Sequence, residues 1–349
     1  MKLDDFRTIF RSSFADSEQW QRWFFDTVAT DPGEIYLAAD RHGKAASALM
    51  MQTYDFLYQG QIIPSAYISC VATLPECRSQ GLSSKVLSDA LSDACSRGIA
   101  LCSLIPAEPH LFDFYARRGF SPVYYCDRGH YTSVHTFRGG CGISAAPDYE
   151  IFHALETSLG CGVLHSRQDF AEIQADMAID GGARLIAMTD TAGSAHAMLF
   201  AADATDGSVR VKCLLADTPA LAEGALARLR EISPGRDITV CSPPLSGEKA
   251  LMQPYGMMRV TQPRLLLETL AQAHPRLKAQ ISLADPLLPQ NTATYTLADG
   301  RCSVAPFHAA PDGLEVDPAT FAAILFGSHD TGRILGIPSH RPFMALMLD

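Results

Sequence analysis

The chain has 349 residues, a length that is typical of two or three domains with sizeable cores. Its composition, 47% hydrophobic and 19% charged residues, is that of a soluble globular protein. The net charge of −10, without a basic cluster, argues against a nucleic-acid partner and favours cationic substrates, although an acidic surface also simply keeps a protein in solution.

The sequence has no feature of a membrane or secreted protein. No apolar run approaches the roughly 18 residues that span a membrane, and the first residues, MKLDDFRTIF, lack a secretory signal. Most of the ten cysteines, such as Cys70, Cys102, Cys213 and Cys241, lie in apolar runs without a C-x-x-C pair, which predicts reduced core thiols and a cytoplasmic protein; a single disulfide is the alternative. The histidines are scattered without an H-x-x-x-H pair, so we expect no metal site.

The first third of the chain begins with helices. Between residues 4 and 30, apolar positions at helical spacing predict two helices, the second capped by Asp16 or Ser17. Residues 34–40 and 44–57 predict two strands of a meander, which are joined by the polar turn DRHG.

The stretch at residues 67–120 carries the most informative pattern. The apolar strand YISCVAT is followed by the turn LPECRSQGLSS and by a helix from Gly81 to Cys95 with one apolar face. The turn brings backbone N–H groups to the positive end of the helix dipole, and Gly81 lets the backbone approach an anion closely. We therefore predict a phosphate site at this turn. A strand at residues 99–104 and the helix LFDFYARR, ended by Gly119, complete the pattern.

A Gly-rich segment, FRGGCGISAAPDY, then predicts a crossing into a second domain that repeats the same plan. The Gly256-Met257 pair near its end matches Gly119-Phe120. The predicted elements are a helix from Gln168, strands ARLIAMTD, SAHAMLFAAD and VRVKCLLAD, the helix ALAEGALARLREI, the strand DITVCS and the segment LMQPYGMMRV.

The pattern changes again after Thr261. Asp317 and Pro318 open a helix near the end of the chain, and the apolar tail PSHRPFMALMLD predicts a buried C-terminal segment. The other predicted elements are a helix at 264–275 and strands at 277–285, 291–299 and 301–307.

The strand, turn and helices of residues 67–120 resemble the GNAT superfamily of acyl-CoA-dependent N-acyltransferases. The pyrophosphate loop of that family reads Arg/Gln-x-x-Gly-x-Gly/Ala, and its next helix presents a Tyr to the coenzyme sulfur. Arg78, Gly81 and Tyr115 match, whereas Ser83 stands where the family usually has Gly or Ala. The alternative interpretation is a Gly-containing turn in an ordinary α/β sheet.

The repeat departs from the family pattern where the chemistry would lie. Between Ala216 and Gly224 there is no Arg-x-x-Gly loop. Met252 takes the place of Tyr115 when Gly256 is superposed on Gly119. We therefore interpret the repeat as a degenerate GNAT-like domain that binds no coenzyme and shapes the acceptor site.

The segment after Thr261 resembles a sterol-carrier-protein-like domain, and the three-part order resembles the enhanced intracellular survival (Eis) family of acetyltransferases over nearly the whole chain. The resemblance implies an α/β (α+β) fold with two GNAT-like mixed-sheet domains and a smaller sterol-carrier-like α+β domain. The implied domains are residues 1–137 (catalytic GNAT), 138–262 (degenerate GNAT-like) and 263–349 (sterol-carrier-like). Because Eis-like proteins assemble into rings, it also implies a homo-oligomer.

The resemblance further implies that acetyl-CoA binds along the strand end and the turn. Backbone groups near two strand residues would meet the pantetheine arm and the thioester oxygen, and the turn would hold the pyrophosphate. The implied coenzyme-binding residues are Val71, Thr73, Arg78, Ser79, Gln80, Gly81, Leu82, Ser83 and Ser84.

In the GNAT fold Tyr115 would be the general acid; the alternative is an amphipathic residue at a domain boundary. The strand YISCVAT contains no carboxylate that could act as base, and Glu76 lies in the loop, too near the phosphates. In the Eis family the C-terminal carboxylate reaches the active site, and here that residue would be Asp349. The alternative for Asp349 is a C-terminal strand with its charge in solvent.

The early helices flank the acceptor groove in a GNAT fold. Trp20 or Trp23 would then wall a substrate pocket, and the alternative for both is core packing against the sheet.

The leading hypothesis is a cytoplasmic N-acetyltransferase that uses acetyl-CoA on a small amine, such as an aminoglycoside-like or polyamine-like cation. Acetylation of a protein N-terminus or lysine would instead need an open groove. A non-catalytic acyl-CoA or lipid-binding protein is a different class, indicated by the sterol-carrier-like tail and by Ser83. Aminoacyl transfer from tRNA is disfavoured by the acidic charge.

Overall fold

The computed structural model describes residues 2–138, 142–179, 182–242, 252–309, 313–327, 333, 336–337 and 341–348. Contacts between residues divide the chain into two units. Unit 1 contains Met1–Tyr124 and Gly256–Pro342, and unit 2 contains Tyr125–Tyr255 and Phe343–Leu348. Residues 263–342 of the predicted third domain thus share unit 1 with the first domain, whereas Phe343–Leu348 belong to unit 2. Within the described part of the chain, no helix is long and apolar enough to cross a membrane.

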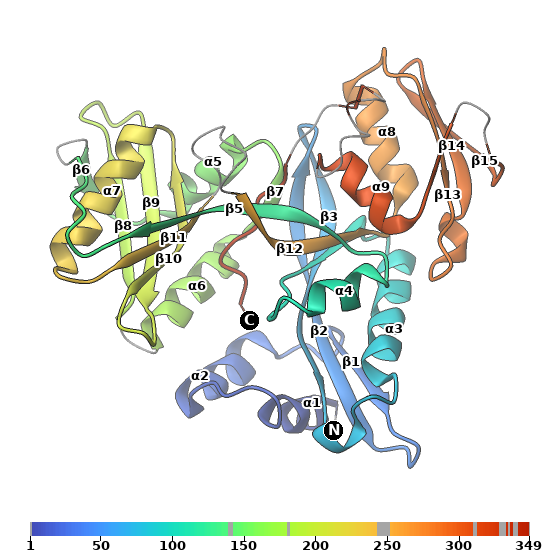
Figure 1. The fold of residues 1–349 in the computed structure, drawn as a ribbon, viewed down its shortest axis with the longest axis horizontal. Helices are drawn as coiled ribbons and strands as arrows, with labels where there is room; N and C mark the ends of the chain where they lie inside the picture. Colours follow the sequence, from blue (N-terminus) through green and yellow to red (C-terminus); the bar gives the residue numbers. More distant parts are fainter. Residues whose placement is uncertain are drawn as a thin grey trace. The chain divides into compact units, whose positions relative to one another are not determined.

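Unit 1 contains a mixed sheet with the strand order β1-β2-β3-β4-β12 (Figure 1). β1, β2 and β3 form an antiparallel meander, as the sequence predicts, and β4 pairs in parallel with β3 and antiparallel with β12. The strands are β1 (Ile35–Ala39), β2 (Ala45–Tyr58), β3 (Gln61–Thr73), β4 (Leu101–Leu104) and β12 (Met252–Val260), of which Gly256–Val260 belongs to this unit.

The helix α3 (Leu82–Ser96) packs its apolar face on this sheet. Figure 1 shows α3 alongside β1 and β2, which it contacts. Val86, Leu87 and Leu91 are fully buried there, and each such side chain contributes about 1.5–3 kcal/mol of burial free energy. The amphipathic helix predicted from Gly81 is therefore confirmed. The short helix α4 (Leu111–Ala116) follows β4.

The N-terminal helices form an aromatic cluster. They are α1 (Lys2–Arg11) and α2 (Glu18–Trp23), which continues as a π-helical turn at Phe24–Val28. The Ser17 hydroxyl caps α2 by accepting a hydrogen bond from the Trp20 N–H at 3.1 Å, as predicted. Trp20 is buried and stacks on Phe24 with ring centroids 4.8 Å apart, so core packing is the correct interpretation of Trp20.

A second sheet in unit 1 has the order β15-β14-β13-β16. α8 packs on its strands β14 and β15. The Asp317 carboxylate caps α9 by accepting a hydrogen bond from the Thr320 N–H at 2.7 Å, which confirms the predicted helix start. The elements are α8 (Pro263–Ala273), β13 (Ala279–Leu283), a 3₁₀ turn (Pro289–Asn291), β14 (Ala293–Ala298), β15 (Arg301–Pro306), β16 (Leu314–Val316) and α9 (Pro318–Leu325).

Unit 2 is built on a mixed sheet with the order β5-β11-β10-β9-β8-β6. α7 packs on β8, β9 and β10, and α5 contacts β9 and β10. The elements are β5 (Ser121–Tyr131), β6 (Ile143–Ala145), α5 (Tyr149–Ser158), β7 (Gly162–Leu164), α6 (Arg167–Ile179), β8 (Arg184–Thr189), β9 (His196–Asp203), β10 (Val209–Ala216), α7 (Pro219–Ile232) and β11 (Ile238–Ser242).

The two sheets repeat one plan, with the last strands exchanged. In each unit an antiparallel meander leads into a helix and a parallel strand: β1-β2-β3-α3-β4 in unit 1 and β8-β9-β10-α7-β11 in unit 2. β5, which follows the first set in the chain, pairs with β11, and β12, which follows the second, pairs with β4. The predicted internal repeat is thus present. Each sheet is completed by a strand that follows the other set of elements in the chain.

The prediction of reduced thiols is wrong for Cys241, which forms a disulfide with Cys126 in unit 2. Antiparallel pairing of β5 with β11 brings the two Cα atoms to 5.5 Å, although the residues are 115 positions apart in sequence. No local sequence pattern predicts that two cysteines so far apart in the chain form a disulfide. The seven other described cysteines are free and buried.

The C-terminal tail is buried in unit 2, as its apolar composition predicts. Phe343 forms a parallel bridge with Gly162, and Met344, Met347 and Leu348 are at least nine-tenths buried. The backbone carbonyl of Met344 accepts a hydrogen bond from the hydroxyl of Tyr255. The predicted terminal residue, Asp349, lies outside the described residues.

Candidate active site

β3 separates from β4 before it ends. The two strands pair only from Ser65 with Leu101 to Tyr67 with Ser103, whereas β3 continues to Thr73. An irregularity in the pairing with β2 and the positive φ of Cys70 (54°) mark a bulge in the part of β3 that is not paired with β4. Bulges bend a strand and redirect its backbone groups. Val71 and Thr73, two predicted coenzyme residues, lie in this free stretch.

The loop that follows leaves the N-terminus of α3 open. Pro75–Cys77 form a 3₁₀ turn, Ser79 has a φ of 62° and Gly81, the residue before the helix, has a φ of 79°. Among the described residues, no side chain caps α3. The first four N–H groups of a helix have no intrahelical acceptor, so those of residues 81–84 are available to a ligand. A Cβ atom built on Gly81 would meet no atom within 4 Å.

Side-chain hydrogen bonds brace this loop against the end of β3. The Thr73 hydroxyl lies 3.1 Å from the Ser83 hydroxyl and 2.9 Å from that of Ser47. The Arg78 Nε donates to the Thr73 carbonyl at 3.4 Å, and the rest of its exposed guanidinium is left toward solvent. Ser83 therefore has a structural partner that Gly or Ala at this position would lack.

Arg118 is a residue of this site that sequence reasoning missed. Its guanidinium donates to the Ser84 hydroxyl in the first turn of α3 and lies 3.6 Å from the centre of the Phe114 ring. Partial burial lowers the pKa of Arg118, yet an arginine stays charged. A fixed positive charge thus stands beside the open helix end. The only signal in the sequence was the pair of arginines before Gly119. The side chain of the second one, Arg118, points back toward Ser84 from the end of α4.

Tyr115 lies at the end of α4 with 6% of its surface exposed. Its ring contacts those of Phe114 and Phe120, at 5.1 and 5.8 Å between centroids. No group in the described part of the chain hydrogen-bonds its hydroxyl. Burial raises the pKa of Tyr115 to about 12, with the nearby Arg118 charge acting in the opposite direction. The phenol therefore keeps its proton throughout the neutral range.

Residues 1–123 match the family model of the acetyltransferase (GNAT) domain. The N-terminal part of the chain is a GNAT acetyltransferase domain. A domain of this family transfers an acyl group that it takes from an acyl-CoA. No curated protein sequence matches the chain.

Solved structures share the fold over almost the whole chain. A probable N-acyltransferase from Enterococcus faecalis is 16% identical, with 99% of this chain and 95% of that one covered and a TM-score of 0.73. A GCN5-related N-acetyltransferase from Anabaena variabilis is 14% identical, with 98% and 96% covered and a TM-score of 0.74. Eis1 from Mycobacterium abscessus is 16% identical, with 96% and 90% covered and a TM-score of 0.70. The fold is thus the Eis-like one expected from the sequence.

The GNAT domain has the features that an acyl-CoA needs. The unpaired edge of β3 offers backbone groups to an extended chain, the N–H groups of residues 81–84 offer donors to a pyrophosphate, and Gly81 leaves space beside them. Arg118 adds a guanidinium at the same helix turn. The residues present therefore fit this donor.

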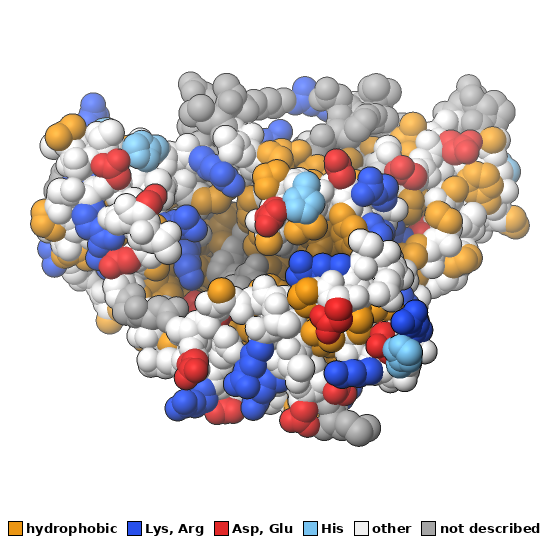
Figure 2. All heavy atoms as spheres, turned by 60° about the horizontal axis from the view of Figure 1, so that its bottom comes forward, with side chains coloured by type: hydrophobic (Ala, Val, Ile, Leu, Met, Phe, Trp, Pro, Cys, Tyr) orange, Lys and Arg blue, Asp and Glu red, His pale blue; other side chains and the backbone are white. Residues whose placement is uncertain are grey.

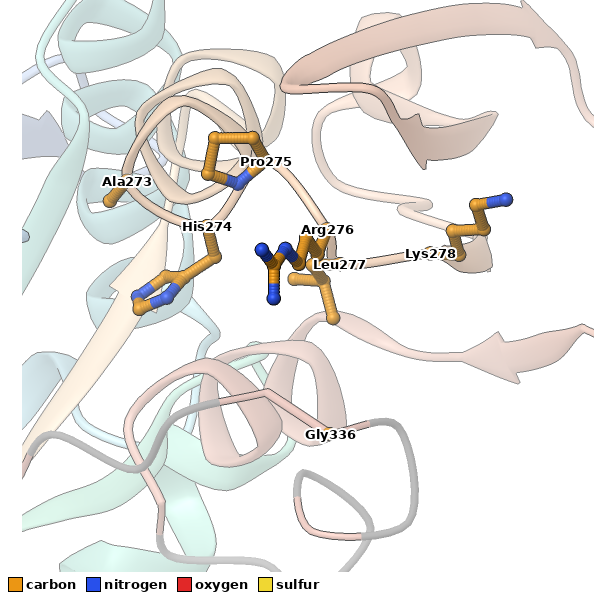
Figure 3. Close-up of a pocket in the computed structure, with 7 residues that line it drawn as sticks. All are labelled: Ala273, His274, Pro275, Arg276, Leu277, Lys278 and Gly336. Atoms are coloured by element: carbon orange, nitrogen blue, oxygen red, sulfur yellow. The ribbon is translucent and has the colours of Figure 1, made fainter.

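A separate hollow of about 610 Å³ lies beyond the end of α8. Figure 3 labels the residues that line it; the side chain of Lys278 points away from the others. None of the lining residues belongs to the loop before α3, so the hollow is separate from the candidate coenzyme site. They are Ala273, His274, Pro275, Arg276, Leu277, Lys278 and Gly336.

Proposed function

We propose that the chain transfers the acetyl group of acetyl-CoA to the amino group of a small cationic acceptor by direct attack. The observation that carries the proposal is the open N-terminus of α3 behind the free end of β3. The thioester would supply the acetyl group. Backbone donors at residues 81–84, with Arg78 and Arg118 nearby, would hold the phosphates, and each charge-assisted hydrogen bond contributes about 1.5–3 kcal/mol.

Tyr115 is the proposed acid. A free thiol has a pKa of about 8.5, so full proton transfer from a phenol of pKa about 12 to a thiolate in water would be uphill. Burial raises the pKa of a thiol as it does that of a phenol, which narrows the gap inside the site. Tyr115 would therefore stabilise the departing sulfur by donating a hydrogen bond, with proton transfer completing as the charge develops.

The proposed base or proton relay is the carboxylate of Asp349. An alkyl amine with a pKa near 10.4 costs roughly 4.6 kcal/mol to deprotonate at pH 7, so a group that accepts or relays the proton is needed. The two residues before Asp349, Met347 and Leu348, are buried. Extending the chain by several glycines would displace the terminal carboxylate without removing this apolar anchor.

We expect the glycine-extended protein to unfold at the same temperature and to bind acetyl-CoA as before, with turnover reduced at least about 10-fold at pH 7. The reduction should shrink toward pH 9, where more of the amine is already neutral. Equal turnover of the two proteins from pH 6 to 9 would remove the terminus from the mechanism.

The acceptor class is proposed from charge. The net charge of −10 attracts cations, and on the face drawn in Figure 2 Lys and Arg side chains are interspersed with Asp and Glu rather than gathered in a stripe. A ring-like homo-oligomer and a cytoplasmic location are proposed from the Eis-like fold and from the seven buried free thiols. The Cys126–Cys241 disulfide is at odds with a reducing compartment.

The decisive experiment combines calorimetry with CoA and a thiol-release assay that uses acetyl-CoA against polyamines, aminoglycosides and peptides. We expect one coenzyme site per chain and release of thiol with a small cationic amine. A protein that binds a long-chain lipid but neither binds nor turns over acetyl-CoA would overturn the proposal in favour of lipid binding. Turnover confined to peptides would move the acceptor class to proteins.

A further inference from the structure

Unit 1 contains a fully buried ion pair outside the residues assigned so far. Arg259 lies on β12 opposite Cys102 of β4, and its Nη2 donates to the Asp285 Oδ1 at 2.6 Å. Both side chains are only 1% exposed. Asp285 belongs to the turn after β13, in the segment that resembles a sterol-carrier domain, whereas β4 belongs to the GNAT domain.

The Asp285 carboxylate is held rigidly. Its Oδ1 also accepts the N–H groups of Leu287 and Leu288 at 3.2 and 3.0 Å. Its Oδ2 lies 3.5 Å from the amide nitrogen of Asn291, and its own N–H donates to the Thr292 hydroxyl at 2.9 Å. The carboxylate that binds the Arg259 guanidinium is therefore fixed in place by hydrogen bonds within its own turn.

The other end of this guanidinium holds the backbone behind the proposed acid. Arg259 Nη1 donates to the carbonyl of Arg118 at 2.6 Å, just after α4 ends. Gly119 makes this approach possible, because a Cβ atom there would lie 1.6 Å from Nη1. Gly119 thus both ends α4 with a φ of 83° and admits the arginine.

The side chain of Arg118 then reaches the coenzyme loop. It bonds the Ser84 hydroxyl in the first turn of α3 and the Phe114 carbonyl within α4. A continuous series of contacts therefore runs from Asp285 through Arg259 and Arg118 to the helix end that would bind phosphate.

We propose that Asp285 and Arg259 are positioning residues that hold the Arg118 guanidinium at the pyrophosphate of the coenzyme. A buried ion pair is a poor means of stabilising a fold, since well-packed apolar residues of the same volume do as well or better. Apolar residues would not form the directional hydrogen bond that fixes the position of the Arg118 carbonyl. The inference rests on the proposed coenzyme site and assigns the C-terminal segment a part in it.

The test replaces the pair as a unit, because removing one partner leaves an unpaired buried charge that threatens folding. The Arg259→Met/Asp285→Leu variant should keep a cooperative unfolding transition but bind CoA about 10- to 100-fold more weakly in calorimetry, the loss expected for one charge-assisted phosphate contact. The matched control is Arg264→Met/Glu268→Leu, which removes an ion pair exposed on α8 and should leave the affinity unchanged.

A double-mutant cycle separates positioning from mere packing. Arg118→Met alone should weaken CoA binding by a similar factor, and adding it to the Arg259→Met/Asp285→Leu variant should cause little further loss. Fully additive losses, or unchanged affinity in the pair variant, would overturn the inference.

Arg259→Lys keeps a charge opposite Asp285 but is too short and unforked to reach the Arg118 carbonyl as well. If the pair variant does not fold, this variant decides: a folded Lys variant with wild-type affinity would overturn the inference, and weakened binding that depends on Arg118 would support it. A wild-type protein that binds no CoA would instead contradict the proposed function itself.

Discussion

The two strand-to-helix junctions at corresponding places of the two units differ in the length of the loop and in the capping of the helix. In unit 1, residues 74–81 separate β3 from α3, and the helix starts at Gly81 without a side-chain cap. In unit 2, only residues 217 and 218 separate β10 from α7. There the Thr218 hydroxyl accepts the Leu221 N–H at 3.3 Å, and Pro219 has no N–H to offer.

The strands around the junctions are alike. β10, like β3, runs beyond its last parallel pair, which is Val211 with Val240, and it also has an irregularity, between Val211 and Cys213. The separation of the two parallel strands therefore occurs in both units and does not by itself make a coenzyme site. The comparison indicates that the capacity to bind phosphate depends on loop length and on an uncapped helix end.

The largest effect is expected for Gly81→Val. A β-branched residue at a φ of 79° is strained, and its side chain would fill the open space beside the N–H groups. Losing two charge-assisted contacts of about 1.5–3 kcal/mol each would weaken CoA binding by two to four orders of magnitude, measurable by calorimetry.

Gly207 offers a matched control in unit 2, with a φ of 84° and equally open surroundings. Gly207→Val should lower the unfolding temperature by about as much as Gly81→Val and leave CoA affinity unchanged. Two CoA sites per wild-type chain, or unchanged affinity in Gly81→Val, would break the distinction between the junctions.

A smaller effect is expected for Tyr115→Phe, which removes the hydroxyl of the proposed acid; Met252, the residue aligned with Tyr115 by sequence, lies on the strand β12 rather than on a helix. Turnover should fall about 10- to 1,000-fold while CoA affinity stays within a factor of about three. Tyr149→Phe on α5 of unit 2 is the control and should leave turnover unchanged. Wild-type turnover in Tyr115→Phe would exclude the acid role.

The same pair of proteins gives a pH test. Because the pKa of Tyr115 is raised to about 12, its phenol stays protonated, and the ratio of wild-type to Tyr115→Phe turnover should be flat from pH 6 to 9. The contribution of the neutral Tyr115 phenol to the free energy of unfolding is complete below about pH 10 and is lost as the pH rises toward 12. A ratio that declines with a midpoint near pH 8 would contradict this pKa direction.

The smallest effect is expected for Thr218→Ala. Loss of the α7 cap should cost about 1 kcal/mol of unfolding free energy, measured by chemical denaturation, because one helix N–H loses its acceptor. CoA affinity should not change. A change in affinity would mean that the second junction takes part in binding after all.

Local chemistry in the sequence determined much of this protein. The apolar face of α3, the caps at Ser17 and Asp317 and the burial of the C-terminal tail follow from spacing, side-chain type and hydrophobicity, which act over a few residues. The GNAT loop was predicted for the same reason, since a turn between an apolar strand and an amphipathic helix is readable from one short stretch.

The tertiary structure alone decided the features that join distant segments. β5 pairs with β11 and β12 with β4, so the Cys126–Cys241 disulfide and the Arg259–Asp285 pair form between residues that no local pattern connects. Arg118 likewise became part of the candidate site only when the end of α4 turned its side chain onto Ser84. Such contacts depend on which strands become neighbours, and that choice is made by the packing of whole sheets rather than by the residues of one strand.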